Sequence, residues 1–272
     1  MNEQQLHQLD DLLRKRFAIG LAGLTDDGIQ AEDRSTIGTV DTFPYAVSDL
    51  LDPVTLRHIL AFQSQQLGDV TLNVAGTMFA KRYSVLIAGM FAAYTLYDFP
   101  ISADPSDIRI RPRQGGMMAY RVQAEWPRPD RTDSVDLRGH SSNRKAHFAA
   151  YAQRIDDHLA AVFEAVNRAA GAHKQVLHSL VVHQVHMMYA RLEAEAAQRE
   201  FQPADRMNRI EDDYRALNER NNTGFRATFR RIEGGPSDPP LLMRRYCCQA
   251  YRTSIGGKPH GYCESCPKTA GR

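Results

Sequence analysis

The chain has 272 residues, and its 43% hydrophobic fraction is enough for a sizeable core in one large domain or two modest ones. Its 34 Lys and Arg side chains nearly balance its 32 Asp and Glu side chains, so the charge does not indicate a nucleic-acid-binding protein. The chain starts with polar residues, and its most apolar run, Tyr83 to Tyr97, is shorter than the roughly 20 residues that cross a bilayer, so we expect a cytoplasmic protein without a membrane anchor.

Helical patterns dominate the first hundred residues. Apolar residues at helical spacing predict an amphipathic helix over 3–22, and they are Leu6, Leu9, Leu13 and Phe17. Residues 25–50 mix small and polar residues with short apolar pieces, which predicts mostly loop. Asp52 can cap the next helix, with Pro53 at its first position, and a third helix is expected from about 75 to 97.

Strand patterns and then helix patterns follow. Residues 108–111 alternate apolar and basic side chains, and residues 117–124 can pair with them as a hairpin. Regularly spaced apolar residues then predict an antiparallel helical hairpin, broken at Gly171, and one further charged helix. These three helices are expected at about 148–166, 173–199 and 204–219.

Gly234 to Pro240 is the most linker-like run of the chain, because its glycines and prolines disfavour regular structure. It separates a body from a C-terminal segment at 241–272. The body consists of an N-terminal helical region (1–100) and a hairpin plus helical hairpin region (101–233). The predicted fold class is therefore α+β and predominantly α-helical, with a small antiparallel sheet and a C-terminal segment that carries every cysteine.

All cysteines of the chain lie within one twenty-residue window, and they are Cys247, Cys248, Cys263 and Cys266. Four thiolates can fill a tetrahedral zinc site or hold an iron–sulfur cluster. The spacing of Cys263 and Cys266 suits zinc, whose paired ligands are usually two to four residues apart. The adjacent Cys247 and Cys248 suit the two iron atoms of a 2Fe–2S cluster better, because neighbouring side chains diverge. Spacing therefore favours the cluster and leaves zinc open; two disulfides are a third arrangement, in which a bridge between the adjacent pair would be strained.

The cysteine motif resembles the C-terminal signature of the FhuF-type ferric siderophore reductases. The matching stretch runs from Arg244 to Arg252 and continues from Cys263 to Pro267. A second and less specific match covers Ala75 to Tyr83. The spacer between the cysteine pairs is longer than in the family pattern, and Gln249 stands where an apolar residue is common, but neither difference removes a ligand.

This resemblance implies a cofactor, a reaction and partners. In that family a CC…CxxC arrangement binds a 2Fe–2S cluster, which would make 241–272 an iron–sulfur segment. The implied function is one-electron reduction of siderophore-bound Fe(III), with release of Fe(II) in the cytoplasm. The expected partners are a ferric siderophore, with the hydroxamate type as one class, and a protein electron donor such as a ferredoxin or flavoprotein, since no nucleotide or flavin motif is present. Transient contact with an inner-membrane siderophore transporter, at the inner face of that membrane, is also expected.

The resemblance also suggests residues that bind substrate. Lys81, Arg82 and Tyr83 could form a basic lip for an oxygen-rich siderophore, or be an ordinary charged turn whose tyrosine packs inward. Three further candidates surround the cysteines in the sequence and could instead raise the reduction potential or be plain surface charges: Arg244, Arg245 and Arg252.

Other interpretations remain beside the reductase. A zinc-stapled module could capture a siderophore or a protein without redox chemistry. A siderophore-synthetase-like protein is disfavoured, because the chain is short, lacks a nucleotide motif and carries the cysteine tail. Four histidines of one predicted helix could hold a metal but more readily make polar contacts within a bundle, and they are His173, His178, His183 and His186.

Overall fold

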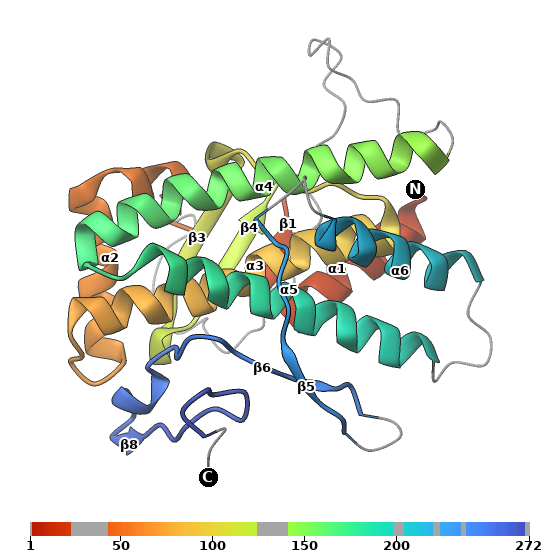
Figure 1. Ribbon diagram of the computed structural model, residues 1–272. Coiled ribbons are helices and arrows are strands. Elements are labelled where there is room, and N and C mark those ends of the chain that lie inside the picture. Colours follow the sequence, from red (N-terminus) through yellow and green to blue (C-terminus); the bar gives the residue numbers. More distant parts are fainter. Residues whose placement is uncertain are drawn as a thin grey trace.

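The computed structural model describes residues 2–22, 43–123, 141–197, 204–219, 224–234 and 238–269. Its helices in these ranges are α1 (Glu3–Phe17), α2 (Pro53–Gln66), α3 (Leu72–Tyr97), α4 (Ser141–Ala170), α5 (Lys174–Ala197) and α6 (Ala204–Asn218). They form a bundle to which small antiparallel pairings are attached (Figure 1). The predicted fold class, predominantly α-helical α+β, is confirmed.

Helix α3 is the centre of this bundle. It is apolar all round and buried over most of its length, as expected of a helix that other elements surround. It packs against α1, α2, α4 and α6, and most extensively against α5, which runs alongside it (Figure 1). In the parts of the chain that the structure describes, no helix is both long enough and apolar enough to cross a membrane.

The starts and ends of several helices follow the expected local chemistry. The Asp52 carboxylate accepts a hydrogen bond from the Thr55 amide at 2.8 Å, and Pro53 begins α2. Gly171 separates α4 from α5 with φ of +68°, a conformation that glycine adopts without steric cost. The predicted start of a helix at Asp52 and the predicted break at Gly171 are therefore confirmed.

The larger sheet contains the predicted hairpin and two short strands that the sequence did not reveal, one on each side of it. Its strands, in the order in which they lie side by side, are β1 (Ile19–Leu21), β4 (Met118–Val122), β3 (Ile108–Pro112) and β2 (Tyr45–Ala46). The β3–β4 hairpin is antiparallel, and β1 is parallel to β4.

The first helix is shorter than predicted for a physical reason. The prediction that it continues to residue 22 is wrong, because Ala18 takes a left-handed conformation with φ of +54° and ends α1. The chain then extends, and Ile19 pairs with Tyr120. The predicted loop at 25–50 falls mostly outside the described residues; within them, the chain forms β2 and a short 3-10 turn at Val47–Leu51.

The C-terminal segment is tied to the body by a strand pair. Strand β5 (Arg230–Ile232) pairs antiparallel with β6 (Leu241–Met243), so the two sides of the linker-like run hydrogen bond to each other. His183 on α5 donates a hydrogen bond from Nε2 to the Leu242 carbonyl at 2.7 Å. Leu241–Met243 thereby fastens the segment to the helical body. Beyond it, β7 (Ser254–Ile255) and β8 (Lys258–Pro259) form a second small pair, and the segment lies below α5 in Figure 1.

The buried side chain of His158 has a protonation state that follows from its partners. His158 contacts the Ala103 carbonyl through Nδ1 at 2.8 Å and the Tyr83 hydroxyl through Nε2 at 2.6 Å. A carbonyl can only accept, so Nδ1 carries the proton and Nε2 accepts from the tyrosine. Burial lowers the pKa of His158 to about 4, and the ring is neutral in the folded protein at neutral pH.

We expect this histidine to make the protein less stable in mild acid. The unfolded chain binds a proton at His158 below about pH 6.5, whereas the folded chain does so only near pH 4, so stability is lost as the pH falls through this window. The expected loss from this group is about 3 kcal/mol of unfolding free energy. Urea unfolding between pH 7 and pH 4 measures it, and His158→Phe should reduce the pH dependence, of which a part remains because burial also lowers the pKa values of His183 and His186.

The Tyr83→Phe variant is the control. It keeps the imidazole but removes its hydroxyl partner, so it should lower the unfolding free energy at every pH and leave the pH dependence in place. If His158→Phe and the unchanged protein showed the same pH dependence of stability, the assignment of a neutral, buried His158 would be wrong.

Candidate metal centre

Backbone hydrogen bonds bring the two cysteine pairs together. The Arg244 amide, just after β6, donates to the Ser265 carbonyl at 3.0 Å, which joins the start of the segment to its end. The Cys266 amide donates to the Cys263 carbonyl at 2.9 Å and closes the turn between these two ligand candidates. Gln249 has φ of +61°, so the chain reverses directly after the adjacent cysteines. The chain from Arg244 to Cys266 thus forms a compact loop that brings the four sulfur atoms together.

The four sulfurs form two pairs that cross between the motifs. Cys247 Sγ lies 3.7 Å from Cys266 Sγ, and Cys248 Sγ lies 3.6 Å from Cys263 Sγ. All four cysteines are free thiols. Each pair therefore takes one sulfur from the adjacent cysteines and one from the CxxC turn.

These distances fit metal ligation. A tetrahedral metal with bonds of about 2.3 Å to sulfur separates its ligand atoms by about 3.7 Å, so each sulfur pair has the length of one edge of such a tetrahedron. Two pairs fit a centre with two metal ions, each held by two thiolates, which is the ligand arrangement of a 2Fe–2S cluster. In the described residues, no group of three or more Cys, His, Asp or Glu side chains is arranged around one metal position. The described residues therefore show two sulfur pairs of ligand spacing and no complete site for a single metal ion.

The sulfurs are shielded from solvent to different extents. Cys248 and Cys266 are each 1% exposed, whereas Cys247 and Cys263 are half-buried. The Gln249 amide donates to Cys247 Sγ at 3.3 Å. Lys81 on α3 donates from Nζ to Cys263 Sγ at 3.5 Å, across 182 positions of sequence. The site is therefore part of the folded body and not a free tail.

Two cations favour the thiolate form that binds metal. The pKa of the Cys263 thiol is lowered by a hydrogen bond from Cys248 and also by Arg244 and Lys81 nearby. Burial alone would lower the pKa of the Arg244 guanidinium, but the sulfurs of Cys248 and Cys263 raise it above its usual value. Metal ligation requires deprotonated thiols, and the two cations supply this form at Cys263. The pKa of the Cys248 thiol is raised by its hydrogen bond with Cys263 and by burial, and burial raises the pKa of the Cys247 thiol.

The structure brings only some of the predicted substrate residues to the sulfurs. Lys81 lies at the site, and Arg82 is half-buried beside it, with a pKa that burial lowers. Arg244 is 6% exposed, and its side chain contacts the Ser265 carbonyl from Nε at 3.4 Å. Arg245 and Arg252 are exposed.

The predicted role of Tyr83 in binding the substrate has to be corrected. Its side chain is completely buried, and its hydroxyl is hydrogen bonded to His158. It faces the core because it stands one position further around α3 than Arg82 and two further than Lys81. The residue cannot contact a substrate in this fold, and the prediction that it does is wrong.

A cavity of about 240 Å³ opens beside Cys263. Its walls come from α3, α5, β6 and the turn at Cys263 to Ser265. Helix α5 contributes Gln184 and Arg191, which sequence reasoning missed. Their only signal is that two polar side chains seven positions apart lie on the same face of this helix.

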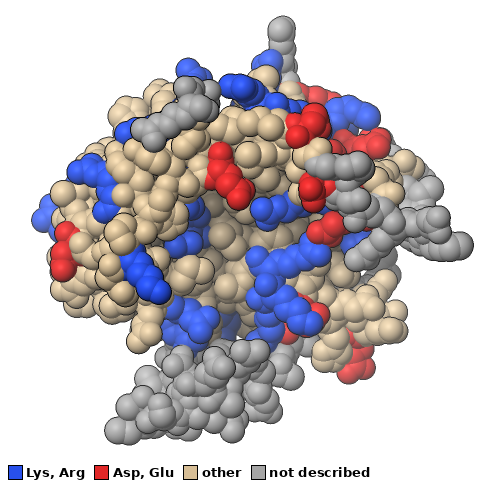
Figure 2. Space-filling model, turned by 90° about the horizontal axis from the view of Figure 1, so that it is seen from below, with Lys and Arg blue, Asp and Glu red and all other residues tan. Residues whose placement is uncertain are grey.

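The face of the molecule that includes the C-terminal segment is rich in basic groups. Figure 2 views the molecule from below, and Lys and Arg side chains surround a hollow in the middle of this face. Three cations line the cavity beside Cys263: Lys81, Arg191 and Arg244. One carboxylate, that of Glu264, lines it as well. The cavity is therefore suited to a ligand that offers hydrogen-bond acceptors.

The histidines of α5 make structural contacts, as the sequence favoured. His183 and His186 donate from Nε2 to backbone carbonyls of Leu242 and Phe225, at 2.7 and 2.9 Å. His178 contacts the Asp156 carboxylate at 3.0 Å. The first two bonds fasten the segments after α6 to α5, and the third joins α5 to α4.

Comparison with known proteins does not assign the chain to a family: no protein-family model matches it, and no curated protein matches it. Its function has to be inferred from the geometry of the sulfur site and the cavity beside it.

Proposed function

We propose that the protein is a ferric siderophore reductase that holds a 2Fe–2S cluster through its four cysteines. The observation that carries this proposal is the crossed pairing of sulfurs, at 3.7 Å for Cys247 with Cys266 and 3.6 Å for Cys248 with Cys263. Two separate thiolate pairs match two iron atoms. The resemblance of the cysteine motif to that of the FhuF-type reductases points to the same cofactor and adds the substrate class.

The residues around the sulfurs have roles that suit electron transfer. When bound, the cluster supplies one electron at a time. Lys81 and Arg244 hold positive charge against Cys263 and Cys248, and positive charge near the sulfurs raises a reduction potential. The burial of Cys248 and Cys266 keeps water away from two of the ligands. Arg245 and Arg252 stay exposed, where they can meet an acidic protein electron donor.

The substrate is Fe(III) in an oxygen-liganded siderophore, and the product is Fe(II). Such ligands hold Fe(II) weakly, because it is a softer and less highly charged ion. One-electron reduction therefore releases the metal without breaking a bond of the organic ligand. We place this reaction in the cytoplasm, on siderophore delivered by an inner-membrane transporter, with a ferredoxin or flavoprotein as electron donor.

The metal content tests the proposal. Protein purified without oxygen is expected to be red-brown and to contain iron and acid-labile sulfide in equal amounts, about two of each per chain. It should also reduce a ferric siderophore when a chemical or protein donor is supplied. A colourless protein with one tightly bound zinc would contradict the reductase and favour a zinc-stapled binding module.

A further inference from the structure

The cavity beside Cys263 is one end of a longer trough along α5. A second cavity, of about 340 Å³, shares two of its walls, Gln184 and Arg191, with the first. The residues of α5 that line the two cavities recur at helical spacing and form one stripe along the helix. This stripe includes Leu180, Gln184, Met187, Met188, Arg191 and Glu195. The shared walls make the two cavities adjoining parts of one trough.

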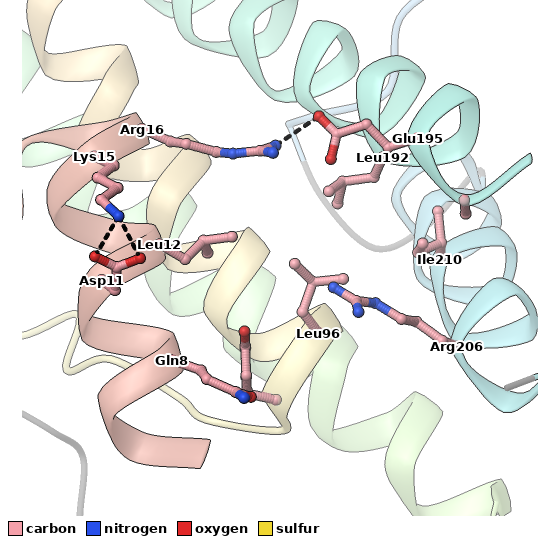
Figure 3. A pocket seen from close by; sticks show the side chains of 12 residues that line it. Gln8, Asp11, Leu12, Lys15, Arg16, Leu96, Leu192, Glu195, Arg206 and Ile210 are labelled. Atoms are coloured by element: carbon pink, nitrogen blue, oxygen red, sulfur yellow. Dashed lines mark hydrogen bonds and ion pairs between the residues drawn. The ribbon is translucent and has the colours of Figure 1, made fainter. Parts of the chain in front are cut away.

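An ion pair marks the far end of this trough. Arg16 on α1 reaches across to Glu195 on α5, with 2.6 Å between Nη1 and Oε1 (Figure 3). Both residues line the second cavity and also a third one, which lies towards α6. The pair therefore stands between the second and third cavities and bounds the trough that begins at Cys263.

From these contacts we propose that the trough binds an oxygen-liganded ferric chelate, with its iron end at Cys263 and its organic arms along α5. This inference rests on the proposed function and assigns its substrate site. A pocket for a ligand of this size usually has about 300–1,000 Å³, so the cavity beside Cys263 is too small alone and needs the adjoining part.

The walls of the trough specify the chemistry of this chelate. Lys81, Gln184 and Arg191 offer hydrogen-bond donors, which suit the oxygen atoms around Fe(III). The apolar side chains of Leu180, Met187 and Leu241 lie among these donors and suit the aliphatic arms of the ligand. The ligand is therefore rich in acceptors and has apolar linkers between them.

The charges favour a chelate without net positive charge. Lys81 and Arg244 act on the cysteine sulfurs, and their charge is balanced by the thiolates. Arg191 is exposed and lines both cavities, so it stands where the first cavity adjoins the second and would face the arms of the ligand. A cationic group on an arm would be repelled there, so Arg191 selects for neutral or anionic chelates.

Cys263 is the sulfur through which the electron reaches this substrate. It is the one cysteine among the cavity-lining residues, while Cys248 and Cys266 are almost fully buried. When bound, the cluster would supply the one electron that converts Fe(III) to Fe(II), and Cys263 would hold it at the cavity. No proton and no covalent bond of the chelate are transferred in this step.

Gallium(III) chelates test the site without reduction, because Ga(III) resembles Fe(III) in charge and size but does not accept the electron. The probes are two Ga(III) complexes of one linear trihydroxamate, either with a free terminal amine or with that amine acetylated. Calorimetry with the cluster-loaded protein should show tighter binding of the acetylated, neutral complex by about three- to tenfold. The variant Arg191→Glu should reverse this preference, and Arg191→Gln should abolish it.

Matched controls separate the site from the cluster. Arg57→Glu makes the same charge change at an exposed position of α2 and should leave both affinities as they are. In all variants the iron and sulfide content should equal that of the unchanged protein. For the Fe(III) complexes, Arg191→Glu should raise KM for the neutral chelate and leave kcat nearly constant, because the residue binds the arm and not the sulfurs.

Several results would overturn the trough and leave the reductase intact. One is a cluster-loaded protein that reduces the ferric chelate but binds both gallium complexes equally well. Another is an Arg191→Glu variant with unchanged preference, or an Arg57→Glu variant with the same effect as Arg191→Glu. A protein with zinc in place of iron would instead overturn the proposed function.

Discussion

Replacing Cys248 with serine is expected to leave the protein without its cluster and to lower ferric siderophore reduction by about 100-fold or more. Replacing a residue that only hydrogen bonds to a metal ligand typically costs about 10–100-fold in metal affinity or activity, and this change removes a ligand itself. A hydroxyl is a poor substitute for a soft thiolate, and at this position it would also be buried, since Cys248 is 1% exposed. Iron and sulfide analysis, together with the visible absorption spectrum, measures the loss.

The crossed pairing makes the prediction more specific. Cys247→Ser, Cys263→Ser and Cys266→Ser should each have the same effect, because every sulfur belongs to one of two metal-sized pairs. Ser265→Ala is the matched control: it changes a side chain between two ligands but keeps the carbonyl that Arg244 contacts, so cluster content should be normal. A Cys248→Ser protein with normal iron and sulfide would show that the adjacent cysteines are not two ligands.

The helices could be predicted from the sequence because they are long and regularly patterned. Asp52 with Pro53 and the break at Gly171 are local signals, and the structure contains them where expected. Strand β1 could not be predicted, because Ile19–Leu21 is three residues long and its partner, β4, lies about a hundred positions away. A short strand is decided by such a partner and not by its own pattern.

The cysteines could be predicted as one site, but the way in which they pair could not. Their clustering in the sequence is a local property, whereas the pairing of Cys247 with Cys266 depends on how the loop folds back. The contact of Lys81 with Cys263 joins distant segments in the same way; the resemblance suggested Lys81 as a substrate residue but not this contact. Gln184 and Arg191 were missed because a polar residue on a bundle helix usually faces solvent without further role.

The misplaced Tyr83 shows the limit of transferring a motif as a block. Lys81, Arg82 and Tyr83 are consecutive, yet a helix turns by about 100° per residue, so consecutive side chains face different directions. Lys81 reaches the sulfurs and Tyr83 lies in the core against His158. In a helical motif, the face of the helix on which each residue lies should therefore be determined before the residues are assigned a common role.

Removing everything after Pro240 is expected to leave a helical protein that is considerably less stable and cannot reduce a siderophore. The six helices keep their own core around α3, so circular dichroism should retain most of its helical signal. The cut removes buried side chains that pack on α5, chiefly Leu242 and Met243, each of which contributes about 1.5–3 kcal/mol through burial. It also leaves His183 without its carbonyl partner.

Together these losses amount to roughly 4–6 kcal/mol, a large part of the about 5–15 kcal/mol that stabilises a typical domain. The melting temperature should therefore fall by about 10 °C or more. A full-length protein with all four cysteines changed to serine is the control, because it loses the cluster but keeps the β6 contacts, and it should melt between the two. Weak binding of a gallium chelate should survive the cut, since Gln184 and Arg191 remain on α5 while one wall of the trough is gone. A truncated chain that unfolds outright would show that the cysteine segment belongs to the main core, and that the helical body is not a separate folding unit to which a redox centre is attached.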